Sequence, residues 1–241
     1  MKIVEVSSNL ATKLLGKYLC DLGWNICIFE SEETYSPYPK EDWNTVKNKL
    51  KEGKREINNL DKLIMEVESA NVLISDLKNV KSLLPGNDMS NIIYINLPAY
   101  ASEDLEHSSF CTDEAAIMSA SGVFNDMGLN RTLLGIRASF SHLPLASVYG
   151  SMFALCALLS CVVQGDVSRY VEVPLASALC EALVHNSIVY PTEDVYVSRR
   201  KQRIAQKRFP VNTETLDSLF DPFRCLWNVS FTIRIITTES M

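Results

Sequence analysis

The alternation of apolar and polar residues predicts a strand–helix–strand unit at the start of the chain. Residues 2–6 and 25–30 have the composition of short strands, and residues 10–22 carry apolar side chains at helical spacing between them. Ser7, Ser8 and Asn9 supply N-cap chemistry before this helix, and Gly23 follows its end. Two strands joined by a helix and short turns form a βαβ unit, which predicts a parallel sheet.

The same kinds of segment continue to about residue 96. Residues 61–69 and 80–84 have helical patterns, and residues 71–75 and 91–96 are strand-like and almost continuously apolar. Strands of this kind are expected where helices cover both faces of a sheet. The predicted fold class is therefore α/β, with an open parallel sheet and helices on both faces.

Residues 138–165 contain no Lys, Arg, Asp or Glu, and the second half of this stretch is the most apolar run in the sequence. Uncharged stretches of about 18 residues or more are candidates for membrane spans. Ser147, Gly150 and Ser151 interrupt it, however, and neither an aromatic belt nor a one-sided basic flank accompanies it. A helix that is apolar on all sides also fits the centre of a large soluble domain. We therefore predict a buried helix and no membrane association.

The composition is that of a globular protein. Of the 241 residues, 47% are hydrophobic and 22% charged, and the net charge of −6 gives no general attraction to nucleic acid or anionic membranes. The first residues lack the apolar core and cleavage site of a secretory signal. The seven cysteines lie in apolar runs without CxxC spacing, which favours reduced thiols in a cytoplasmic protein. The three histidines do not pair with Cys or a carboxylate at ligand spacing, so we predict no metal site.

Two basic segments leave alternatives open. Residues 47–55 (KNKLKEGKR) fit either a solvated helix end or a phosphate-facing patch beside a ligand cleft, and residues 198–208 (SRRKQRIAQKR) fit a solvated helix or linker. The sequence has no GxGxxG, GxxxxGKS/T, GxSxG or HExxH motif, and its first strand-to-helix turn lacks the glycines that let a backbone approach pyrophosphate. The residues by themselves thus indicate a soluble α/β domain that binds a ligand.

The order of seven segments carries a family resemblance. They are Leu19-Cys20-Asp21-Leu22-Gly23 with Glu30, Gly53-Lys54-Arg55-Glu56-Ile57 with Leu60-Asp61, Ala70-Asn71-Val72-Leu73-Ile74, residues 91–96, residues 113–122, residues 150–159 with 170–173, and Asp221-Pro222-Phe223-Arg224-Cys225. In this order they resemble the family III CoA-transferases, the CaiB/BaiF group. That group includes formyl-CoA transferase, carnitine CoA-transferase and α-methylacyl-CoA racemase.

The resemblance implies a Rossmann-like sheet that binds CoA at the carboxyl ends of its strands. The residues implied to bind CoA there are Ser8, Asn9, Leu10, Ala11, Asp76, Leu77 and Lys78. CoA or acyl-CoA is then a substrate and not a permanently bound cofactor, and the chain forms a homodimer or a heterodimer with a homologous chain. Family transferases use an Asp nucleophile against the acyl-CoA thioester, forming an acyl-aspartyl anhydride and then an aspartyl-CoA thioester.

The sequence departs from the family at this nucleophile. The resemblance places the Asp within residues 145–149, but the sequence there is LASVY and no carboxylate occurs from residue 127 to 165. Ser147 is the nearest residue of a nucleophilic type, although an unassisted hydroxyl is a poor nucleophile. Asp113 matches the acidic position of the family's preceding helix, and it equally fits a carboxylate at a helix start. Ser147 and Asp113 are therefore the candidate catalytic residues.

The resemblance divides the chain at about residue 190. Residues 1–190 are expected to form the CoA-binding large domain, and residues 191–241 a basic linker with the start of an incomplete small domain. The predicted function is a CoA-transferase-like protein that binds CoA or acyl-CoA, with chemistry weakened or lost for want of the Asp. The alternatives are a non-catalytic subunit that pairs with a catalytic homologue, an α-methylacyl-CoA racemase-like protein, and a plain binding module.

Overall fold

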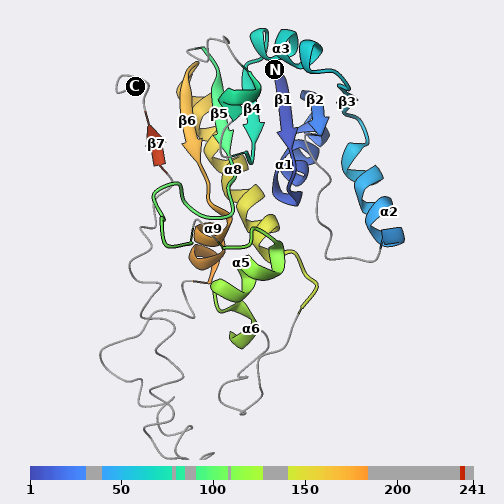
Figure 1. The fold of residues 1–241 in the computed structure, drawn as a ribbon. Coiled ribbons are helices and arrows are strands. Elements are labelled where there is room, and N and C mark those ends of the chain that lie inside the picture. The colour runs from blue at the N-terminus through green and yellow to red at the C-terminus, as the bar shows by residue number, and fades with distance from the viewer. Residues whose placement is uncertain are drawn as a thin grey trace, which may run out of the picture.

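A seven-stranded sheet forms the centre of the computed structural model, which describes residues 1–30, 40–77, 80–84, 91–107, 110–126, 141–183 and 234–236 (Figure 1). The strands are β1 (Lys2–Ser7), β2 (Asn25–Glu30), β3 (Arg55–Glu56), β4 (Val72–Ser75), β5 (Ile93–Asn96), β6 (Arg169–Glu172) and β7 (Arg234–Ile236). Their order is β3-β2-β1-β4-β5-β6-β7, with the first six parallel and β7 antiparallel to β6. The predicted α/β class with an open parallel sheet is confirmed.

Helices pack on both faces of this sheet. They are α1 (Leu10–Asp21), α2 (Lys40–Lys51), α3 (Leu60–Glu68), α4 (Val80–Leu83), α5 (Glu114–Ala120), α6 (Val123–Asp126), α8 (Leu145–Gln164) and α9 (Leu175–Ala182). One buried cluster joins the sheet to α1, α8 and α9, and a second joins it to α3 and α4. Successive residues of β1 divide between them, since Ile3 belongs to the first cluster and Val4 to the second. This explains why the strands are mostly apolar on both faces, with a few buried polar side chains such as Glu5 and Ser75.

The uncharged stretch contains α8, which packs against α1 and α9. Its inner face is built from small residues, and a Cβ added at Gly150 would meet Leu175 Cδ2 of α9 at 2.3 Å. Its outer face leaves Met152 and Val163 exposed, the latter to 87%. In the described part of the chain, α8 is the one helix long and apolar enough to cross a membrane. The prediction of a buried helix holds for this inner face only, since 44% of the apolar window of α8 is buried.

The predicted second domain lies almost wholly outside the described residues. Within 191–241, only β7 is described, and it extends the same sheet beside β6. The sequence pattern did not predict this strand. The division of the chain at residue 190 stays a prediction.

Candidate functional site

The strand order reverses between β1 and β4, and in open α/β sheets ligands bind at the carboxyl ends of the strands beside such a point. The chain leaves β1 through Ser8 and Asn9 and leaves β4 through Asp76. The Asp76 carboxylate accepts hydrogen bonds from the Ser8 N–H at 2.9 Å, the Ser8 hydroxyl at 2.9 Å and the Asn9 N–H. The structure thus brings together three of the residues that the sequence assigned to a CoA site.

Asp76 occupies the place that a ligand anion takes at many helix starts. The amide groups at the beginning of α1 point at this carboxylate, as amides do toward phosphate in nucleotide-binding turns. Burial raises the pKa of Asp76, and the bonds from Ser8 and Asn9 oppose that rise. The amides of Ser8 and Asn9 are therefore already bonded within the chain.

The remaining residues of the predicted CoA site differ in how far they are buried. Asn9 caps α1 by accepting from the Thr12 N–H at 2.9 Å, and its side-chain amide donates to the Leu97 carbonyl at 3.0 Å. Leu10 and Ala11 are buried, so their side chains belong to the core. The Leu77 N–H donates to Ser75 Oγ at 3.1 Å. Lys78 lies outside the described residues, and direct ligand contact by this set stays a prediction.

Three lysines surround one carboxylate at the carboxyl end of β2. Glu30 pairs with Lys13 at 2.9 Å, and with Lys47 and Lys51 of α2 at 3.1 Å each. Burial alone would raise the pKa of Glu30, but the bonds from these lysines lower it to about 2. Lys47 and Lys51 therefore lie at the carboxyl end of β2, and their facing a phosphate stays a prediction.

Lys54 and Glu5 form a buried ion pair that is part of the core. Lys54 Nζ lies 2.7 Å from Glu5 Oε2, both side chains are fully buried, and Lys54 also donates to the Lys13 carbonyl at 2.9 Å. Gly16 makes room for this pair, because a Cβ there would come within 1.9 Å of Glu5 Oε2. The basic segment at residues 47–55 thus splits into partly exposed lysines on α2 and a buried lysine after it.

The start of α8 carries Ser147, which the sequence nominated in place of the missing Asp. Its hydroxyl donates to Glu114 Oε2 at 2.5 Å, and the N–H groups of Ala146 and Ser147 donate to Glu114 Oε1 at 2.7 and 3.2 Å. Burial raises the pKa of Glu114, against the effect of these bonds. A carboxylate from α5 therefore reaches the start of α8, where the resemblance had placed an Asp.

The sequence analysis nominated Asp113, the residue next to Glu114. Asp113 is the N-cap residue of α5, and its side chain makes no capping hydrogen bond. Glu114, one position on, lies on the side of α5 that faces α8. Adjacent residues of a helix point in directions about 100° apart, so only one of these two carboxylates can face α8. The sequence does not show on which side of α5 the helix α8 packs. Among the described residues, no group of three or more His, Cys, Asp or Glu side chains could hold a metal ion.

Comparison with known proteins adds a functional relative. The chain is 26% identical over 243 aligned residues to the CoA-transferase/lyase DddD of a Marinomonas species, covering 92% of this chain and 29% of that protein. The sequence is therefore similar to a CoA-transferase. This agrees with the resemblance to CoA-transferases found in the sequence, and the chain spans less than a third of the length of that relative. No family model matches the chain.

Solved structures confirm the fold. The hypothetical protein Rv3272 from Mycobacterium tuberculosis superposes with a TM-score of 0.59 and 15% identity, covering 77% of this chain and 57% of that one. Its orthorhombic crystal form gives a TM-score of 0.59 at 16% identity, covering 77% and 55% of the two chains. At this level of identity the likeness concerns the arrangement of strands and helices.

Proposed function

We propose that this chain binds coenzyme A or an acyl-CoA thioester at the carboxyl edge of its sheet, as a CoA-transferase-like protein of family III. The similarity to a CoA-transferase/lyase over 92% of the chain carries the proposal. The reversal of strand order between β1 and β4 supports it, because ligands of open α/β sheets bind beside such a point. CoA or acyl-CoA is a substrate here, and the chain pairs with a second copy or with a homologous chain.

The lysine group at β2 fits the phosphate-bearing end of CoA. Lys13, Lys47 and Lys51 bring three positive charges to Glu30, and Lys51 also pairs with Glu56 at 3.2 Å, so the group carries one positive charge in excess. The surplus positive charge attracts phosphate, and Lys47 and Lys51 are partly exposed, so they can exchange a bond to Glu30 for one to a ligand. The amides of the Ser8–Asn9 turn are held by Asp76, so the proposal assigns the phosphates to the lysines.

We assign the reacting end of acyl-CoA to the start of α8, where the Ser147 side chain is buried. Serine becomes a useful nucleophile when an adjacent base accepts its proton, and Glu114 stands 2.5 Å from the Ser147 hydroxyl. In the proposed step, the hydroxyl proton moves to Glu114 while Oγ bonds to the thioester carbonyl carbon. The C–S bond then breaks and CoA leaves as the thiolate, giving an acyl ester on Ser147 that an acceptor carboxylate or water can discharge.

A covalent trap tests this step. The purified chain is incubated with radiolabelled acetyl-CoA and quenched in acid, and labelled peptides are identified by mass spectrometry, with hydroxylamine added to release the acyl group. The proposal predicts label on Ser147, lost in S147A and strongly reduced in E114Q. Ser160, exposed on the same helix, supplies the matched control, since S160A should label like the native chain. Label that persists in S147A, or that sits elsewhere, contradicts the assignment.

A non-catalytic role is the second candidate, and one observation favours it. Glu114 also accepts from the amides of Ala146 and Ser147, which is how a carboxylate caps a helix. If capping is its whole role, the chain binds CoA and supports a catalytic homologue without reacting. CoA binding with no covalent label on any residue would select this candidate over the first.

A further inference from the structure

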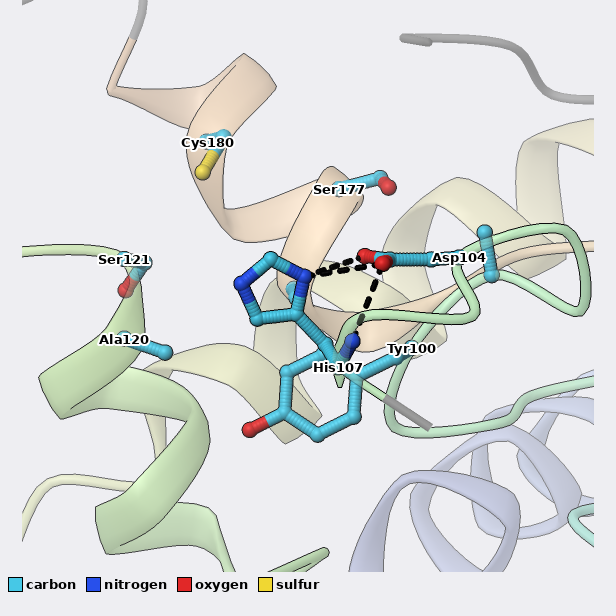
Figure 2. A pocket seen from close by; sticks show the side chains of 9 residues that line it. Tyr100, Asp104, His107, Ala120, Ser121, Ser177 and Cys180 are labelled. Carbon is cyan, nitrogen blue, oxygen red and sulfur yellow. Dashed lines mark hydrogen bonds and ion pairs between the residues drawn. The ribbon is translucent and has the colours of Figure 1, made fainter. Parts of the chain in front are cut away.

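The cavity shown in Figure 2 lies between the loop after β5 and the helix α9, and it is too small to bind a substrate. Its volume of about 20 Å³ holds about one water molecule. At its edge His107 Nδ1 lies 2.7 Å from Asp104 Oδ2, and Tyr100 stacks on the imidazole with ring centroids 5.8 Å apart. These contacts hold the loop in one shape beside α9. The helix layer is closed at this point, and its exposed apolar surface lies instead on α8.

Four apolar side chains form a stripe along the outer face of α8. Met152, Leu159 and Val163 are 50%, 37% and 87% exposed, and Cys156 is exposed between them. They follow one another at intervals of four, three and four residues, so they line one side of the helix. That side is opposite the small residues that α8 packs against the core. We call these four residues the outer seam.

The spacing of the outer seam is that of a surface on which helices pair. Apolar residues that alternate at intervals of three and four occupy the a and d positions of coiled coils, where the partner is another helix. Ser160 lies beside the seam, and its hydroxyl donates to the Cys156 carbonyl at 2.8 Å. This hydroxyl needs no water as an acceptor, so a helix can cover the seam without leaving that donor unsatisfied.

Charge favours the α8 helix of a second copy as the partner. The chain has a net charge of −6, but the twenty residues of α8 include no Lys, Arg, Asp or Glu. Two copies can therefore approach along α8 without the like-charge repulsion expected elsewhere on the surface. Charges beside the seam, which select a different partner in coiled coils, are missing from α8. Helices that lie on membranes carry Lys and Arg on the polar face, and α8 has neither.

The size of the outer seam sets the strength of this contact. A helix of 20 residues is about 30 Å long and about 10 Å wide, so a contact along α8 buries roughly 300 Å² on each copy. Val167, 69% exposed just after the helix, extends the stripe by one position. Stable interfaces bury about 800 Å² on each partner. A pair formed through α8 is therefore reversible and dissociates on dilution.

We propose that α8 is a self-association surface, on which the outer seams of two copies pack against each other about a two-fold axis. In such a pair the same patch serves on both chains. This dimer is the second-copy pairing of the proposed function, so the inference rests on that proposal, and it needs no bound CoA. Cys156 lies near the middle of the seam, which brings its thiol beside the partner's seam.

Sedimentation equilibrium without CoA, from about 1 µM to about 1 mM protein, measures the pairing of the native chain, M152D, V163D and M65D. The native chain should pass from monomer to dimer over this range. M152D and V163D each bring two carboxylates into the contact, which should raise the dissociation constant at least about tenfold. Met65 is an exposed methionine of α3, on the other face of the sheet, so M65D should pair like the native chain.

A thiol trap locates the contact on α8. A short bismaleimide should link two copies of the native chain through Cys156, with the linked peptides identified by mass spectrometry, and C156S should abolish this link. Cys111 is exposed outside α8 and supplies the matched control, since C111S should cross-link like the native chain. Circular dichroism and melting curves confirm that each variant is folded.

Each outcome decides for or against the surface. Dimers that persist in M152D and V163D, or cross-links that avoid Cys156, overturn it. A native chain that stays monomeric at about 1 mM also overturns it, as does flotation of the monomer with phosphatidylcholine vesicles, which would assign the seam to lipid. Calorimetry with CoA on the same samples separates the two proposals: CoA binding by a chain that never pairs refutes the surface alone, and pairing through Cys156 without CoA binding refutes the CoA-binding function alone.

Discussion

Replacement of Lys54 by methionine should strongly destabilise the fold, because it breaks a buried ion pair. Lys54 Nζ lies 2.7 Å from Glu5 Oε2 on the central strand β1, and both side chains are completely buried. K54M removes the ammonium group and leaves the carboxylate without a compensating charge, since Glu5 Oε1 has no hydrogen-bond partner among the described residues. Breaking a buried pair in this way costs about 3–5 kcal/mol.

The assay is urea unfolding of the native chain, K54M, E5Q and the double variant, followed by circular dichroism. In E5Q/K54M no charge remains buried, so most of the loss in K54M should be recovered, because replacing both members of a buried pair is often close to neutral. Lys17, which pairs with the exposed Asp21, supplies the control: K17M should leave the urea midpoint nearly unchanged. A K54M variant within about 1 kcal/mol of the native chain, or a double variant weaker than both singles, would refute the reasoning.

Further outcomes follow from the same contacts. G16A should cost about 1–3 kcal/mol by urea unfolding, because its Cβ meets Glu5 Oε2 at 1.9 Å and Lys54 Nζ at 2.7 Å inside the core; native stability in G16A would contradict this packing. The pKa of Glu30 falls from 4.5 to about 2 on folding, so its contribution to stability is complete above about pH 4.5 and is lost as the pH falls toward 2. Acid titrations followed by circular dichroism should show a flatter curve for E30Q over that window, and an identical curve would show that the three lysines do not stabilise the carboxylate. D76A should lower the melting temperature, since three donors from Ser8 and Asn9 lose their acceptor, and added phosphate should restore part of the loss in D76A but not in the native chain.

The sequence predicted the parts of the fold that depend on local pattern. The apolar runs of β1, β2, β4 and β5, and the N-cap at Asn9, follow from period and capping alone. The grouping of Ser8 with Asp76 was also within reach, because parallel strands bring their carboxyl ends to one edge. These features require only the order of elements along the chain.

The residues that sequence reasoning missed depend on packing between distant segments. Glu114 was passed over for its neighbour Asp113, because only the placement of α8 beside α5 shows which carboxylate faces Ser147. The spacing of Asp104 and His107, three residues apart, could have signalled an Asp–His contact within one turn of chain. The sequence around Asp104 and His107 did not show that α9 packs beside them, because Cys180 of α9 lies more than 70 residues further along the chain.

Titration calorimetry with CoA tests the central claim most directly. The account predicts saturable binding to the native chain, weakened in K47A/K51A and weakened further as salt rises, because these lysines meet the phosphates. K62A, an exposed lysine on α3 away from this edge, should bind like the native chain. Absence of any binding heat at about 1 mM CoA, where even weak complexes form, would contradict the assignment of this fold to a CoA-binding function.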